Sequence, residues 1–168
     1  LGRHLTWRLQ SEGWYVVVYD RKPNDWFIDG EAGSLEYIQG DIFDSAMLRG
    51  ALGFEPPTVV FHLAALADVR NALNEPLRQF EMNYLATFHL LEAMRETGCQ
   101  RLAFTSTAVV YGDTDGQYGN RLIVQEGPRK GQILPNRITE KSHCFPQQTS
   151  IYGAMKLASE ALIEAYCC

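Results

Sequence analysis

Short apolar runs alternate with segments of helical periodicity along the chain. The apolar runs are expected to form four strands, over 14–19, 35–39, 58–63 and 101–106. Segments whose apolar positions recur every three or four residues are expected to form helices over 2–12, 45–52, 76–97 and 150–166. The apolar runs are continuous rather than alternating, which is typical of parallel strands covered on both faces. This order predicts an α/β fold built on a doubly wound parallel sheet.

Between 112 and 149 the pattern fails. Glycine and proline punctuate this polar stretch, and only Leu122 to Val124 has the composition of a strand. We expect a long loop or a small hairpin insertion. Loops of this length are often lids or binding loops, and a variable surface excursion is the alternative.

The composition and charge narrow the class of protein. A chain of 168 residues with 46% hydrophobic residues can bury the core of one domain. Its net charge is −5 and it has no basic block, so nucleic acid is not expected as a primary ligand. No apolar run approaches the ~20 residues of a membrane span. The four cysteines lack metal-ligand spacing and the density of a disulfide scaffold, so we expect no metal site and a cytoplasmic location.

Two residues near the end of the chain have a spacing that suits acid–base chemistry. Tyr152 and Lys156 are four residues apart in the last expected helix, so both side chains lie on one face. An ammonium one turn from a phenol favours the phenolate, which makes the tyrosine a usable base near neutral pH. This spacing also occurs by chance in many helices, so its interpretation depends on the rest of the sequence.

A second feature lies at the end of the fourth expected strand. Thr105, Ser106 and Thr107 follow one another there. Open α/β sheets bind their ligands at the carboxyl ends of the strands, where a hydroxyl can bond with a substrate oxygen. The alternative is that these residues merely cap the strand end.

Together with Phe61-His62-Leu63-Ala64-Ala65 and Met82-Asn83-Tyr84-Leu85-Ala86-Thr87, these motifs resemble the extended short-chain dehydrogenase/reductase family. The match is to its NAD-dependent nucleotide-sugar epimerase/dehydratase branch and runs over almost the whole chain. The resemblance implies a Rossmann-type fold and NAD as the cofactor. Leu1 to Leu5 are similar to the tail of the family's glycine-rich loop, so we expect that the first strand is missing. Residues 1–168 are interpreted as a partial NAD-binding domain, inactive on its own and without the C-terminal substrate domain.

The resemblance also implies which residues contact the cofactor. Gly2 would let the first helix pack close to its strand, and Asp20 would bind the adenosine ribose, which favours NAD over NADP. Arg21 and Lys22 stand beside it, so NADP stays an alternative. The other implied cofactor residues are Asp41 and Ile42 at the adenine, Leu63, Ala64 and Ala65 at the ribose and phosphates, Asn83, Ser106 beside the nicotinamide, and Tyr152 with Lys156. His62 is interpreted as a packing residue rather than a catalytic one.

For catalysis, the resemblance implies Tyr152 as general base, Lys156 as the residue that activates it and holds the nicotinamide ribose, and Thr107 as the hydroxyl that orients the substrate. Related dehydratases and decarboxylases have acidic residues directly after the threonine, where this chain has Ala108 and Val109. A nucleotide-sugar epimerase is therefore favoured. An NAD(P)-dependent reductase or dehydrogenase of the same superfamily, or a non-catalytic dinucleotide-binding module, stays open.

The resemblance finally implies a homodimer. The helices over 76–97 and 151–166 would pair with their copies across a two-fold axis. Their apolar faces could equally belong to the core.

Overall fold

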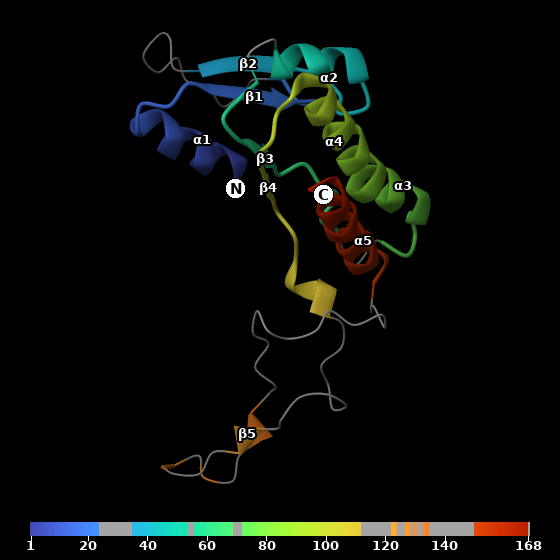
Figure 1. Cartoon of the computed structure of the whole chain (residues 1–168). Coiled ribbons are helices and arrows are strands. Elements are labelled where there is room, and N and C mark those ends of the chain that lie inside the picture. The colour runs from blue at the N-terminus through green and yellow to red at the C-terminus, as the bar shows by residue number, and fades with distance from the viewer. Residues whose placement is uncertain are drawn as a thin grey trace.

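A computed structural model describes residues 1–23, 35–53, 56–68, 72–111, 122–123, 127–128, 130, 133–134 and 150–167. Figure 1 shows the arrangement of the helices and strands in this part of the chain. In this view α1 (Gly2–Ser11) lies on one side of the first strands and α2 (Ser45–Leu52) on the other. The predicted burial of the strands on both faces is only partly confirmed, since the strand residues Val17 and Phe61 are 38% and 39% exposed.

The strands form parallel pairs, as predicted. Strand β1 (Val16–Asp20) pairs with β2 (Leu35–Gln39), and β3 (Val60–His62) pairs with β4 (Leu102–Phe104). Within the described residues, no ladder joins one pair to the other. Each pair directs its carboxyl ends to a single edge, where the candidate site residues follow the strands.

Strand β1 begins later than predicted. Trp14 and Tyr15 precede it and are 50% and 61% exposed, so they are not part of a buried strand. The reason is the end of α1. Gly13 has a φ of +83°, and the amide of Trp14 donates to the carbonyl of Leu9 at 3.1 Å. The backbone of Trp14 is therefore used in terminating the helix.

Two helices begin at side-chain caps. The Asp44 carboxylate accepts from the amide of Met47 at 2.9 Å at the start of α2. The Ser150 hydroxyl accepts from the amide of Gly153 at 3.0 Å, which starts α5 (Ile151–Tyr166). Each cap satisfies one of the amides that a helix leaves without a partner. The cap at Ser150 fixes where the face that carries Tyr152 and Lys156 begins.

The expected helix over 76–97 has the right extent but is not a uniform α-helix. It consists of α3 (Pro76–Phe80), a π-helical turn η1 (Glu81–Leu85) and α4 (Ala86–Thr97), and it ends at Gly98 with a φ of +77°. A π-turn leaves a carbonyl to bond outside the regular ladder. Here the hydroxyl of Ser159 in α5 donates to the carbonyl of Asn83 at 2.7 Å.

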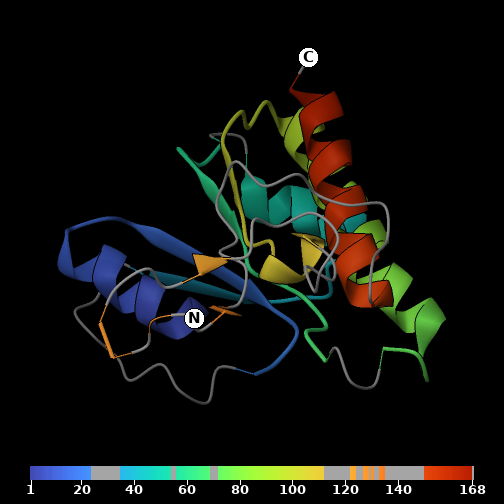
Figure 2. The ribbon, with the colours of Figure 1, turned by 90° about the horizontal axis from the view of Figure 1, so that it is seen from below.

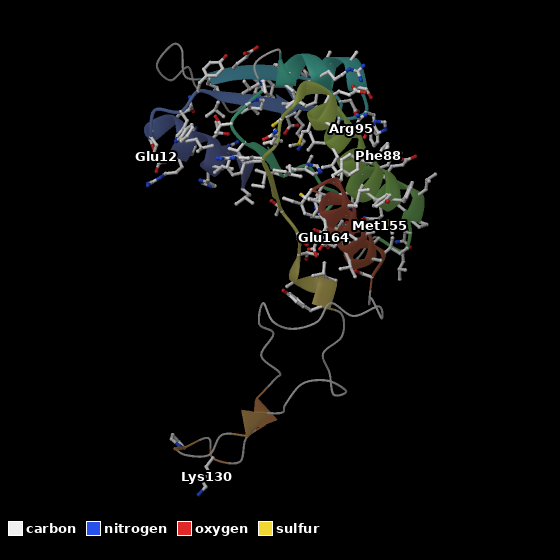
Figure 3. All side chains as sticks on the ribbon, viewed as in Figure 1. Glu12, Phe88, Arg95, Lys130, Met155 and Glu164 are labelled. Carbon is white, nitrogen blue, oxygen red and sulfur yellow. The ribbon has the colours of Figure 1, made fainter. Side chains whose placement is uncertain are left out.

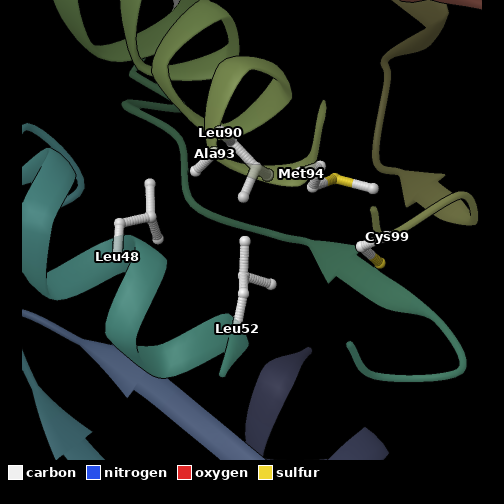
Figure 4. Close-up of a cluster of buried hydrophobic side chains, with 6 residues drawn as sticks. All are labelled: Leu48, Leu52, Leu90, Ala93, Met94 and Cys99. Atoms are coloured by element: carbon white, nitrogen blue, oxygen red, sulfur yellow. The ribbon is translucent and has the colours of Figure 1, made fainter. Parts of the chain in front are cut away.

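The main hydrophobic cluster joins α2 to α4. Figure 4 shows Leu48 and Leu52 of α2 facing Leu90 and Met94 of α4. Ala93 and Cys99 complete the cluster, and Tyr19, Ile42, Val60 and Leu102 pack around it. The cluster therefore ties both strand pairs to the same helical layer.

Helix α5 lies beside this layer rather than in the cluster. It packs against α3, η1 and α4, and against the 3₁₀ turn η2 (Ala108–Tyr111) that follows β4. Figures 1 and 2 both show α5 alongside α4. The Tyr166 hydroxyl donates to Glu92 Oε1 of α4 at 2.5 Å. These contacts hold the Tyr152–Lys156 face against the end of β4.

The predicted insertion contains a hairpin. Strands β5 (Leu122–Ile123) and β6 (Ile133–Leu134) pair antiparallel, with Leu122 opposite Leu134. The amide of Lys130 donates to the carbonyl of Gly127 within the connection. Most of 112–149 lies outside the described residues. Among the helices of the described segments, none has the length and apolar character of a membrane span.

Candidate active site

Lys156 is the most completely enclosed charged side chain of the described residues. Its residue exposure is 2%, and its ammonium donates to the carbonyl of Thr105 at 2.9 Å. The ammonium also lies 4.4 Å from the centre of the Phe104 ring, a cation–π distance. Burial lowers the pKa of Lys156, and the charge of Glu160 acts in the opposite direction. The helix and the strand end thus hold this cation in one place.

Tyr152 lies on the same face of α5, one turn before Lys156. It is 7% exposed, and within the described part of the chain no group forms a hydrogen bond with its hydroxyl. Buried hydroxyls normally have a partner. An enclosed phenol without a partner among the described residues is therefore suited to a partner that arrives with a ligand.

Thr107 stands where the chain turns from β4 into η2. Its side chain is half-buried, and its hydroxyl oxygen accepts from the amide of Val109 at 3.3 Å. The amide of Val110 donates to the Thr107 carbonyl. Because η2 packs against α5, the end of β4 and the Tyr152–Lys156 helix are neighbours.

Ser106 and Glu160 join the same two elements. The Ser106 hydroxyl donates to Glu160 Oε1, which connects the end of β4 to α5 one turn beyond Lys156. The sequence predicts Ser106 at the site but does not single out Glu160. The signal that could have found Glu160 is its position four residues after Lys156, which places both on one helix face.

His62 is a buried packing residue, in agreement with its interpretation from the sequence. It is 3% exposed, and its Nε2 lies 3.0 Å from the Thr87 hydroxyl. Burial, with a contribution from the charge of Lys156, lowers the pKa of His62 to about 4. The ring is therefore neutral at physiological pH and adds no charge beside Lys156.

Asn83 acts on the loop after β3. It is 1% exposed; its amide oxygen accepts from the amide of Leu66 at 2.9 Å and its NH₂ donates to the Leu66 carbonyl at 3.2 Å. The same NH₂ donates to Gln79 Oε1 at 2.7 Å. Through these bonds the Asn83 side chain holds the loop that contains Leu63, Ala64 and Ala65.

That loop presents small side chains at the surface. Ala64 and Ala65 are exposed and Leu63 is half-buried. A Cβ built on Gly2 would lie 3.6 Å from Leu63 Cδ1, so the first turn of α1 lies against the end of β3. This is ordinary van der Waals contact, and space alone does not require glycine at position 2.

The remaining predicted cofactor residues lie at the ends of β1 and β2. Asp20 is exposed, and its Oδ1 accepts from the amide of Lys22 at 2.9 Å. Asp41 is also exposed, and its Oδ1 accepts from the amide of Phe43 at 3.0 Å. Ile42 is half-buried against the core cluster. Both carboxylates keep an oxygen to accept from the hydroxyls of a ligand.

Position 40 holds this end of the sheet together. The Tyr19 hydroxyl donates to the Asp41 carbonyl at 2.7 Å, and the ring crosses directly over Gly40. A Cβ on Gly40 would collide with Tyr19 Oη and would lie 2.6 Å from Met47 Sδ. Only glycine fits there, and nothing in the sequence pattern alone identifies this contact.

The described residues contain no group of three or more His, Cys, Asp and Glu side chains that could hold a metal ion. His4 contacts the ring of Trp7, and His89 Nδ1 lies 3.4 Å from the Ser45 hydroxyl. His143 and Cys144 lie outside the described residues.

Comparison with known proteins shows what this arrangement is similar to. The model of the NAD dependent epimerase/dehydratase family matches residues 1–168. A UDP-glucose 4-epimerase of Lacticaseibacillus casei is 32% identical over 167 residues, 97% of this chain and 43% of that protein. A UDP-glucose 4-epimerase of Yersinia pestis is 40% identical over 119 residues, 67% of this chain and 35% of that protein. The chain spans less than half of the length of either relative.

A solved structure is similar over the same range. MoeE5 in complex with UDP-glucose and NAD superposes with a TM-score of 0.74 at 32% identity, over 98% of this chain and 45% of that chain. The fold is α/β of the Rossmann type, as the sequence predicts. The match of the family model over the whole chain confirms the resemblance, and the chain belongs to the NAD dependent epimerase/dehydratase family.

Proposed function

We propose that the protein is an NAD-dependent nucleotide-sugar epimerase in which Tyr152 is the general base. The observation that carries the proposal is the enclosed pair on α5. Tyr152 and Lys156 are both buried on one face of the helix, and Lys156 is bound to the carbonyl of Thr105 at the end of β4. The relatives named UDP-glucose 4-epimerase support a sugar attached to a nucleoside diphosphate as the substrate.

The residues on the edge of the sheet fit a dinucleotide. Asp20 offers a carboxylate to the hydroxyls of the adenosine ribose, and Asp41 with Ile42 flanks the adenine. The small side chains after β3 leave room for the ribose and phosphates, and the NAD-bound MoeE5 structure supports this assignment. NAD held by these residues would supply the hydride transfer that epimerisation of a sugar carbon needs. Gly2, Asn83 and Ser106 complete the proposed cofactor contacts, with Asn83 acting through the loop it holds.

The chain's own residues supply proton transfer and orientation. Tyr152 takes the proton of the sugar hydroxyl and later gives it back, while Thr107 donates to or accepts from the same oxygen. The Lys156 ammonium stabilises the negative charge of the phenolate one turn away and binds the nicotinamide ribose. General acid–base catalysis of this kind contributes ~10²–10⁴ in rate.

Two neutral residues after Thr107 favour epimerisation over elimination. Ala108 is exposed and Val109 half-buried, and neither can exchange a proton. Removal of water or of a carboxyl group needs an added acid or base at the site. We therefore expect hydride removal and return without loss of a substituent.

The proposal is tested with the intact protein, supplied with NAD or NADP and with UDP-glucose, UDP-galactose and other sugar nucleotides. Interconversion of a pair of epimers with NAD supports it. Reduction of a non-sugar carbonyl with NADPH, with no epimerisation, would show that the protein is a reductase instead. NAD binding without turnover of any sugar nucleotide would indicate that the protein is a non-catalytic dinucleotide-binding module.

We also propose a homodimer that pairs the helical element of α3 and α4, and helix α5, with their copies in a second chain. Leu77, Phe80 and Phe88 are 67%, 39% and 38% exposed and follow one another along α3 and α4. In Figure 3, Phe88 of α4 and Met155 of α5 both lie on the side of the molecule away from α1. Sedimentation should give a dimer for the wild type and a monomer for Leu77→Asp. A monomeric wild type at tens of micromolar would refute the proposal.

A reducing compartment suits the free thiols of Cys99 and Cys167. We propose that the enzyme works in the cytoplasm. Cell fractionation with an antibody against the protein tests this, and recovery from the periplasm or culture medium would contradict it.

A further inference from the structure

Glu160 lies between two groups of the candidate site. Its carboxylate accepts from the Ser106 hydroxyl at the end of β4, and its charge acts on the ammonium of Lys156 four residues earlier. Among the ion pairs of the described segments, none joins Glu160 to Lys156. The carboxylate therefore bonds with Ser106 and acts on Lys156 through space.

A serine hydroxyl has one proton and two lone pairs. Because that proton is donated to Glu160, the lone pairs of Ser106 are what the hydroxyl offers to a ligand. Ser106 is half-buried, so one side of its oxygen is open to a neighbour. Glu160 thereby makes Ser106 an acceptor, while Thr107, the next residue, keeps a hydroxyl proton that it can donate.

The charge of Glu160 matters because the other contacts of Lys156 with described residues are uncharged. They are the Thr105 carbonyl and the face of the Phe104 ring, both from the β4 segment. Of the residues that the structure describes, the titratable groups around the ammonium are His62 from β3, which is neutral above its pKa of about 4, and Tyr152 and Glu160 from α5. An ammonium removed from water is costly unless a negative charge offsets it.

We propose that Glu160 is a positioning residue of the site, which fixes Ser106 as a hydrogen-bond acceptor and places a negative charge one helical turn from the buried Lys156 ammonium. This deepens the proposed function and rests on it for the roles of Ser106 and Lys156. The ligand group that Ser106 recognises is accordingly a donor, an N–H or O–H of the cofactor or sugar, and not a carbonyl or phosphate oxygen.

The first test titrates Lys156 in the protein without cofactor or substrate. Lysine labelled with ¹³C at Cε gives few signals because the chain has four lysines, and the Lys156 signal is the one lost in Lys156→Met. We expect Glu160→Gln, which keeps the shape and an acceptor oxygen, to lower the pKa of Lys156. Glu164→Gln, one turn further along α5, is the matched control and should change it less. Equal changes in the pKa of Lys156 in the two variants would overturn the proposed role of the Glu160 charge.

The second test is a double-mutant cycle between Ser106→Ala and Glu160→Gln, read as the shift in Tm. Both substitutions act on one hydrogen bond. The fall in Tm of the double variant should therefore be smaller than the sum of the falls in the two single variants. Additive losses would overturn the link to Ser106. Neither experiment uses turnover or bound NAD. The role of Glu160 can therefore be refuted in an active epimerase, and it can be supported in a protein that is not an epimerase.

Discussion

His62 shows how a single buried residue makes the stability of the fold depend on pH. Its folded pKa of about 4 lies below the usual value of 6.5. Between these two values the unfolded chain binds a proton that the folded chain does not. The contribution of the neutral ring to stability is therefore complete above pH 6.5 and is lost as the pH falls towards 4.

We predict that the free energy of unfolding falls by up to ~1.4 kcal/mol for each pH unit across this window. Urea denaturation from pH 7 to pH 4 measures it. His62→Gln places a neutral amide near Thr87 and should flatten the slope, whereas His4→Gln on exposed α1 should leave it unchanged. A His62→Gln slope equal to that of the wild type would refute this account of the histidine.

Glycine 40 gives a second prediction at the scale of one residue. Gly40→Ala introduces a Cβ that collides with Tyr19 and Met47, and we expect a loss of about 1–3 kcal/mol in stability. Gly50→Ala is the matched control, because a Cβ there meets no atom within 4 Å and position 50 lies inside α2. The free energy of unfolding of the control should rise by about 0.5–1 kcal/mol, because alanine is favoured over glycine inside a helix. Equal stabilities of the two variants would contradict the contact.

The residue types at the site are predictable from the sequence, and their contacts are not. The spacing of Tyr152 and Lys156 by itself places both on one helix face. It does not indicate that Lys156 lies against Phe104 and the Thr105 carbonyl, because those contacts join segments more than 50 positions apart. The Tyr19–Gly40 contact is equally unpredictable from the pattern, because it joins two different strand ends.

The central helical element connects the loop after β3 to α5. Asn83 in the π-turn bonds through its side chain with Leu66 and through its carbonyl with Ser159. Apolar periodicity identifies the helix but not the π-turn, because one inserted residue scarcely changes a pattern of threes and fours. The capping residues are better signals, since Ser150 and Asp44 act within three positions of themselves.

At this scale we predict that Asn83→Ala removes the protection of the Leu66 amide against hydrogen exchange and costs about 1–3 kcal/mol in stability. The loss follows from leaving the part-buried backbone amide and carbonyl of Leu66 without their partner. Ser159→Ala removes the other bond of the same turn and should cost about 1 kcal/mol while the Leu66 amide stays protected. Exchange of Leu66 at the same rate in wild type and Asn83→Ala would show that the side chain does not hold the loop.

In the whole molecule, α1 begins beside the end of β3 and α5 lies against the end of β4. The fold class and family follow from the order of the motifs, and the family match and the solved structures bear them out. The insertion is predictable only as a loop or hairpin, since glycine and proline show where regular structure stops but not how the chain continues. The choice of sugar depends on residues that this order of motifs does not contain.

The most direct test of the central claim compares kcat for epimerisation in Tyr152→Phe and Tyr166→Phe. Both remove one hydroxyl from α5, but Tyr166 bonds with Glu92 at the far end of the helix. Tyr152→Phe should lose ~10²–10⁴ in kcat while the Kd for NAD changes little, and Tyr166→Phe should stay near the wild type. A Tyr152→Phe enzyme as active as the Tyr166→Phe control would contradict the account.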